Sequence, residues 1–156
     1  MATPSSSART DFALLVVRFA FGAQMALLHG WGKVQTYLAG ATSFADPLGI
    51  GWKYSFWGTI AGEFVCGILL ALGLFGRLAG FGMAFTMGVA AFMVHGDAAW
   101  AKRELAVCYM AAALLIMIAG SGRFSLDQLV LPRVLAKFRR GGAKVSAGAK
   151  SRRVEA

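Results

Sequence analysis

The chain has 156 residues, of which 58% are hydrophobic and 15% are charged, and its mean hydropathy is +0.63. Soluble domains are nearer half apolar and carry about a quarter charged residues, so this composition excludes an ordinary soluble globular domain. The net charge of +9 comes mostly from residues 121–156. Beside apolar segments, a basic tail indicates membrane topology and contact with anionic lipid, so we expect no nucleic-acid binding.

The chain opens with a polar segment that an apolar one follows. Residues 1–11 are rich in Ser and Thr, and this composition predicts a disordered N-terminus. Residues 12–33 form the first apolar run, which is long enough to span a bilayer. Arg18 interrupts this run and further apolar runs follow it, so we interpret it as a retained transmembrane helix and not as a signal peptide.

Three further apolar runs complete the predicted fold. They cover residues 54–75, 78–95 and 104–120, and only Gly76 and Arg77 separate the first two of them. A span needs roughly 20 apolar residues, so the last two runs are slightly short and depend on flanking residues. The sequence therefore predicts an all-α, polytopic membrane four-helix bundle over residues 12–120.

The distribution of Lys and Arg predicts which side of the membrane each end faces. Basic residues favour the cytoplasmic side, and residues 121–156 are rich in them. We therefore predict that the N and C termini are cytoplasmic and that the loop at residues 34–53 lies outside. Residues 121–156 are expected to form an interfacial segment and a basic cytoplasmic tail that contacts anionic lipids.

Polar and small residues recur along one face of the first predicted helix. Arg18, Gly22, Met25 and His29 follow one another at spacings of three and four, so they lie on one face, which we expect to point into the bundle. Gly22 would let another helix approach closely. For Arg18 we favour a structural anchoring role over a functional one.

Glu63 lies near the middle of the second predicted helix, where an exposed charge is costly. It is therefore expected to face the bundle interior and to interact with at least one of four groups: Arg18, His29, His95 and Glu104. Gly58 and Gly62 form a small-xxx-small pair beside it and predict a packing surface. A proton-accepting role and a structural ion pair both remain open for Glu63.

A second polar group is predicted at the outer mouth of the bundle. His29, His95, Glu104 and Lys33 fall near the outer ends of three predicted helices. At this depth a histidine is a proton shuttle or a ligand of a quinone head group, or simply a hydrogen-bonded residue of the interface. The two His and two Glu lack the Glu-x-x-His spacing of carboxylate-bridged metal bundles, so we predict no metal site.

The two cysteines, Cys66 and Cys108, both lie inside apolar runs. Their spacing matches neither a redox pair nor a zinc site. Counted from the outer ends of their helices, they differ in depth by roughly 10 Å, whereas a disulfide needs Cα atoms within about 7 Å. We interpret them as small packing residues.

Several short motifs, in this order, resemble those of the DoxX family of small bacterial membrane proteins. The resemblance covers about residues 12–127, although Ser121 stands where the family often has Pro. The motifs are Leu28-His29-Gly30 with Lys33, Gly62-Glu63 with Gly67, Leu72-Gly73-Leu74-Phe75-Gly76-Arg77-Leu78, Val94-His95-Gly96, Glu104-Leu105-Ala106 with Tyr109, and Gly120-Ser121-Gly122-Arg123-Phe124-Ser125-Leu126-Asp127.

The resemblance implies a subunit of a redox system in the bacterial inner membrane, quinone-linked or concerned with thiol stress, with redox partner subunits. A relative, DoxD, is a subunit of thiosulfate:quinone oxidoreductase. On this reading His29, Lys33, His95 and Tyr109 are the quinone contacts, and Glu63 accepts a proton, with Glu104 a further candidate. Any enzymatic role is at most that of a membrane subunit. The alternative is a non-catalytic membrane scaffold or small-solute carrier.

Overall fold

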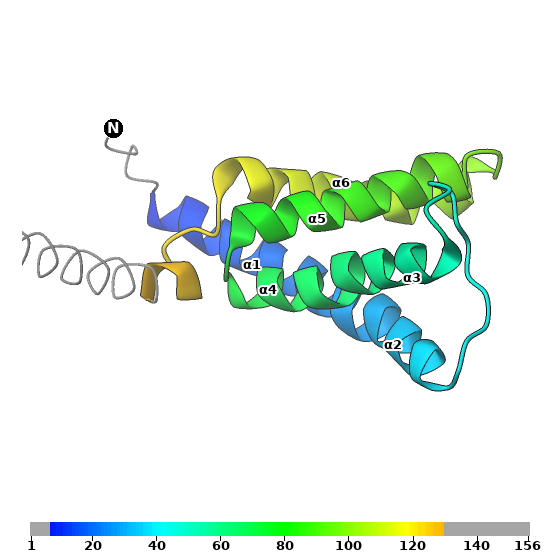
Figure 1. Ribbon diagram of the computed structural model, residues 1–156. Helices are drawn as coiled ribbons and strands as arrows, with labels where there is room; N and C mark the ends of the chain where they lie inside the picture. Colours follow the sequence, from blue (N-terminus) through cyan, green and yellow to red (C-terminus); the bar gives the residue numbers. More distant parts are fainter. Residues whose placement is uncertain (1–6, 130–156) are drawn as a thin grey trace, which may run out of the picture.

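The computed structural model describes residues 7–129, and this part of the chain is helical with no β-strand. It forms four helical segments that run back and forth, as Figure 1 shows. The all-α prediction is therefore confirmed. The elements are α1 (Ala8–Gln24), η1 (Met25–Gly30) and α2 (Trp31–Leu38) in the first segment, α3 (Trp52–Ile60), η2 (Ala61–Val65) and α4 (Cys66–Leu72) in the second, α5 (Gly76–Val89) and η3 (Ala90–Val94) in the third, and α6 (Trp100–Ala119) in the fourth.

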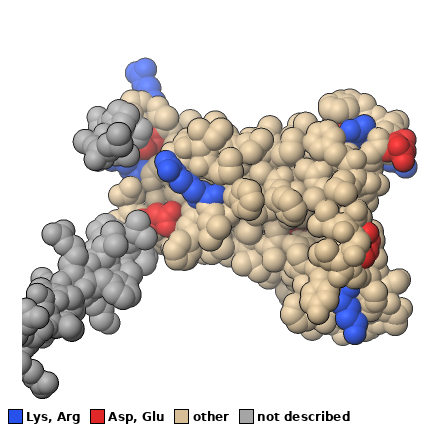
Figure 2. Space-filling model, turned by 45° about the horizontal axis from the view of Figure 1, so that its top comes forward, with Lys and Arg blue, Asp and Glu red and all other residues tan. Residues whose placement is uncertain are grey.

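Three of these segments are long and apolar enough to cross a membrane: Ala8–Leu38, Trp52–Leu72 and Gly76–Val94. The fourth, α6, carries three charged residues, Lys102, Arg103 and Glu104, near its start. Large apolar side chains are exposed along the helices, for example Phe19, Leu28, Phe81 and Ile118. On the face in Figure 2, charged side chains gather toward the two ends and leave an uncharged band between them. This is the surface of a multi-pass membrane protein.

The first helix is longer than predicted at both ends, since it begins at Ala8 and continues through α2 to Leu38. Ser7 is its N-cap, because the Ser7 hydroxyl accepts a hydrogen bond from the Thr10 amide, and Asp11 lies in the first turn. Residues 8–11, expected in the disordered N-terminus, are thus helical. Residues 1–6 and the basic tail at residues 130–156 lie outside the described residues.

The turn between the second and third segments comes earlier than Gly76 and Arg77. Gly73 ends α4 in the left-handed conformation, with φ at +68°, and the Leu74 amide donates to the Leu69 carbonyl, as in a Schellman motif. Asp127 stabilises this turn from a distant part of the chain. Its carboxylate accepts hydrogen bonds from the Phe75 and Gly76 amides at 2.8 and 3.2 Å.

We call this end of the bundle, where Ser7 and residues 120–129 also lie, the tail end. The opposite end, with residues 39–51 and His95, is the loop end; the loop is the extended segment at the right of Figure 1. At the tail end the Asp11 carboxylate accepts a hydrogen bond from the Arg123 amide at 3.1 Å. Both ends of the described chain therefore meet on one side of the bundle.

Small residues let the first and second segments cross closely. A Cβ atom on Gly22 would lie 2.7 Å from the Gly67 carbonyl oxygen, and one on Gly67 would lie 2.9 Å from the Ala26 amide nitrogen. A Cβ on Gly30 would lie 2.6 Å from the Phe64 Cα. The predicted close approach at Gly22 is therefore confirmed, and it continues at every fourth residue, through Ala26 to Gly30.

Candidate functional site

Three π-helical segments interrupt the described helices: η1, η2 and η3. A π turn inserts one extra residue into a helix, and such turns occur frequently at functional sites. Glu63 lies within η2, His29 lies within η1, and His95 follows η3 directly. The interruptions therefore coincide with three of the polar residues that the sequence singled out.

A cavity of about 390 Å³ lies between the second and third segments toward the loop end. Residues of the 39–51 loop form part of its wall, and most of the lining side chains are apolar. Both the size and the lining are typical of small-molecule sites, which range from about 300 to 1,000 Å³. The lining residues are Lys33, Phe44, Ala45, Pro47, Leu48, Ile50, Tyr54, Ser55, Gly58, Thr59, Ala61, Gly62, Glu63, Cys66, Gly82, Phe85, Thr86, Val89, Ala90, Val94 and His95.

The two glycines beside Glu63 have different roles. A Cβ on Gly62 would lie 1.9 Å from the Thr86 hydroxyl oxygen, so Gly62 is where the second segment packs against α5. Gly58 has no atom within 4 Å of its Cβ position, and it lines the cavity. The predicted packing surface is therefore correct at Gly62, whereas Gly58 leaves space for the cavity.

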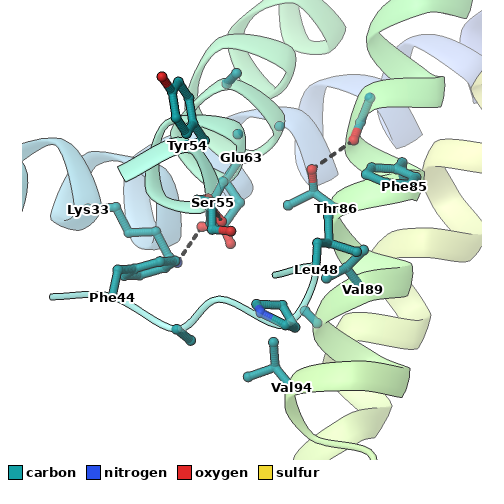
Figure 3. A pocket seen from close by; sticks show the side chains of 18 of the residues that line it. Lys33, Phe44, Leu48, Tyr54, Ser55, Glu63, Phe85, Thr86, Val89 and Val94 are labelled. Carbon is teal, nitrogen blue, oxygen red and sulfur yellow. Dashed lines mark hydrogen bonds and ion pairs between the residues drawn. The ribbon is translucent and has the colours of Figure 1, made fainter. Parts of the chain in front are cut away.

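Glu63 is paired with Lys33, at 2.5 Å between Lys33 Nζ and Glu63 Oε2. The Glu63 side chain is 6% exposed and that of Lys33 is 29% exposed. Figure 3 shows the two side chains meeting on one side of the cavity, with Val89 across from them. The expectation that Glu63 faces the interior is met. Its partner, however, is none of the four groups expected.

The predicted partner was wrong because Lys33 was placed at the outer mouth by its backbone position alone. A lysine carries its charge on a long flexible stem that lies along apolar surface. From α2 this stem reaches the carboxylate in η2. Arg18, the expected cationic candidate, lies at the tail end, where its guanidinium donates to the carbonyls of Ala71 (2.9 Å) and Phe124.

Arg18 is thus the structural anchor that the sequence favoured. It is 2% exposed and also donates to the Leu70 carbonyl at 3.4 Å. The Ala71 carbonyl lies at the end of α4, where carbonyls have no partner within the helix, so a cation there satisfies it and interacts favourably with the helix dipole. One side chain therefore joins the first segment, the end of the second and residues 120–129.

The group predicted at the outer mouth does not come together in one place. His95 lines the same cavity as Lys33 and Glu63. His29 instead lies edge-on to the Tyr109 ring, with 5.6 Å between centroids, and neither of these residues lines the cavity. Glu104 is exposed at the start of α6 and does not line the cavity either.

Cys66 also lines the cavity, and both Cys66 and Cys108 are free thiols. Within residues 7–129, no three His, Cys, Asp or Glu side chains gather into a metal-binding group.

The loop of residues 39–51 builds part of the site, which was not predicted from the sequence. The Phe44 ring stacks on Phe56 at 4.2 Å between centroids. Asp46 in this loop accepts hydrogen bonds from the Gly51 amide (2.8 Å) and the Ser55 hydroxyl (2.6 Å). The Ser55 hydrogen bond is the main reason that the pKa of Asp46 is lowered. Asp46 followed five residues later by Gly51 is the only local signal, and it is a weak one.

The comparison with protein families adds one finding. A family model described as DoxX matches residues 13–96, which is more than half of the chain. No curated protein and no solved structure matches.

Proposed function

This chain belongs to the DoxX family, and we propose that it binds the head group of a quinone-type redox carrier in the cavity between the second and third segments. In this proposal the protein is a subunit of a redox system in the bacterial inner membrane. The observation that carries the proposal is the Lys33–Glu63 ion pair at the wall of an otherwise apolar cavity between membrane-length helices.

The position of the cavity supports a lipid-soluble ligand. Its lining includes Tyr54 and Phe85, which are 72% and 54% exposed on the outer surface of the helices. In a membrane this surface faces lipid, so a ligand with an apolar tail can enter from the side. A molecule that combines such a tail with a polar ring matches both the apolar lining and the charged pair.

The polar residues have separate roles in this proposal. Lys33 and His95 contact the ring oxygens, and Glu63 is the proton acceptor. Carrying an ion pair into lipid is costly, which supports a functional reason for its presence. His29, Tyr109 and Glu104 lie away from the cavity and are not among the proposed contacts.

The proposed setting is a bundle that crosses the membrane four times, with both termini cytoplasmic. Residues 121–156 would form an interfacial segment and a basic tail on anionic lipid, near the redox partner subunits. The meeting of both ends of the described chain at the tail end supports an even number of crossings.

A pair of glycines offers a test with a matched control. Gly58 and Gly32 both have no atom within 4 Å of their Cβ positions, but only Gly58 lines the cavity. We expect Gly58→Leu to fill the cavity and to abolish co-purification of quinone, measured by mass spectrometry, while Gly32→Leu retains it. Absence of quinone from the folded wild-type protein, with no binding of added quinone, would favour a scaffold or small-solute carrier.

A further inference from the structure

Three hydroxyls that line the cavity can act only as hydrogen-bond acceptors toward a ligand. The hydroxyls of Ser55, Thr59 and Thr86 all donate within the protein, to Asp46 Oδ1 (2.6 Å), the Ser55 carbonyl (2.8 Å) and the Gly82 carbonyl (3.0 Å). A hydroxyl has one donor, so what these groups can offer a ligand is lone pairs.

Glu63 adds a stronger acceptor. Its Oε2 atom accepts from Lys33, and no residue in the described part of the chain donates to its Oε1 atom. Glu63 is 5% exposed and lines the cavity, so a ligand in the cavity can donate to Oε1. An ionised carboxylate can only accept hydrogen bonds, so Oε1 offers the ligand an acceptor and no donor.

The donors that line the cavity belong to Lys33, His95, Tyr54 and, more weakly, Cys66. Lys33 has three N–H groups, of which one is engaged by Glu63. His95 supplies a ring N–H at an exposed position. The ion pair therefore presents an acceptor directly beside a donor.

The oxidised and reduced forms of a quinone differ in whether their oxygens can donate a hydrogen bond. A quinone carbonyl only accepts, so it can bind Lys33 but would leave Glu63 Oε1 facing another acceptor. A hydroquinone hydroxyl donates as well, so one oxygen can accept from Lys33 while its hydrogen is donated to Glu63. Hydrogen bonds to charged groups are stronger than those between neutral groups.

We infer that the cavity binds the hydroquinone form of its ligand more tightly than the quinone form. This inference rests on the proposed function and adds which redox state the site selects. A hydrogen bond to a charged group is worth about tenfold or more in affinity. For a two-electron couple, tenfold tighter binding of the reduced form raises the potential of the bound ligand by about 30 mV.

The test is anaerobic titration calorimetry of the full chain in detergent with decylbenzoquinone and with its hydroquinone. We expect the hydroquinone to bind about tenfold more tightly. If both forms bind equally, or the quinone binds more tightly, this inference is wrong while the proposed function stands. If neither form binds the folded protein, the proposed function itself fails.

Glu63→Gln shows whether the carboxylate causes the preference. The amide supplies a donor in place of an oxygen, so we expect the hydroquinone-to-quinone affinity ratio to fall to about one, a roughly tenfold change. Glu104→Gln is the matched control, because Glu104 is exposed and away from the cavity, and it should leave the ratio unchanged. An unchanged ratio in Glu63→Gln would overturn the assignment to this residue. If that variant does not fold, the wild-type ratio still decides the inference.

Discussion

The Asp46 carboxylate holds the loop beside the cavity through hydrogen bonds, and the stability of this loop conformation should depend on pH. The hydrogen bonds from Ser55, Gly51 and Ile50 hold the pKa of Asp46 below its ordinary value of 3.8. A group whose folded pKa is lowered contributes stability that is fully present above its ordinary value and is lost as the pH falls through the folded value. We therefore expect cleavage of the loop in limited proteolysis to stay constant down to about pH 4 and to rise below it.

Asp46→Asn separates this effect from general acid unfolding. The amide cannot accept at both oxygen positions, so the loop should be cleaved faster at neutral pH and should lose the acid-dependent step. Asp97→Asn, at an exposed position elsewhere at the loop end, is the control and should behave like the wild type. A step of unchanged size in Asp46→Asn would show that another group fastens the loop.

The residues of the site differ in how far the sequence could predict them. Glu63 was identifiable from the sequence, because a carboxylate in the middle of an apolar helix is costly in a membrane and is expected to be paired or functional. Its partner was not, since the choice of Lys33 depends on how far a flexible side chain reaches across to another helix. His29 and Glu104 were grouped with His95 by depth alone, and depth does not tell which side of a helix faces a cavity.

The crossing of the first two segments depends on backbone contact between elements. The Cβ of a residue replacing Gly22 would meet the Ala71 amide nitrogen and the Gly67 carbonyl oxygen, both at 2.7 Å. Backbone atoms inside a helix cannot move aside alone, so Gly22→Val should force the helices apart. Overpacking costs about 1–3 kcal/mol and sometimes more. We expect a clearly lower melting temperature in detergent.

Gly32→Val is the control for this prediction. The same helix carries Gly32, no atom lies within 4 Å of its Cβ position, and the residue is exposed. Both variants replace glycine by valine inside a helix and so share the same change in helix propensity, and only the contact distinguishes them. Equal melting temperatures would mean that the two segments do not cross at Gly22.

Periodicity predicted the helices but not their interruptions. Apolar runs gave the elements with errors of a few residues at their ends, because caps such as Ser7 and Gly73 decide where a helix starts or stops. The π turns in η1, η2 and η3 have no signature in the hydrophobic pattern. Each shifts the faces of its helix by one residue, so the arrangement around the cavity could not be derived from spacing.

At the scale of the whole molecule, charge distinguishes the two ends of the bundle. The loop end carries Lys33, Lys53, Lys102 and Arg103. The tail end carries Arg9, Arg77 and Arg123, and the basic residues of the C-terminal tail follow in sequence. Basic residues close to the spans favour the cytoplasmic side. With the C-terminal tail included, this count favours the proposed orientation, in which the tail end is cytoplasmic and the loop of residues 39–51 faces outward.

Cysteine labelling in intact cells tests this orientation. In a chain with Cys66→Ala and Cys108→Ala, we expect a membrane-impermeant maleimide to label Ser43→Cys from outside and Gln128→Cys only after the cells are opened. Both positions are exposed, at opposite ends of the bundle. Labelling in detergent controls for reactivity, because both variants should then react fully. The reverse pattern in cells would invert the topology, and labelling of both from outside would mean that the bundle does not cross the membrane as proposed.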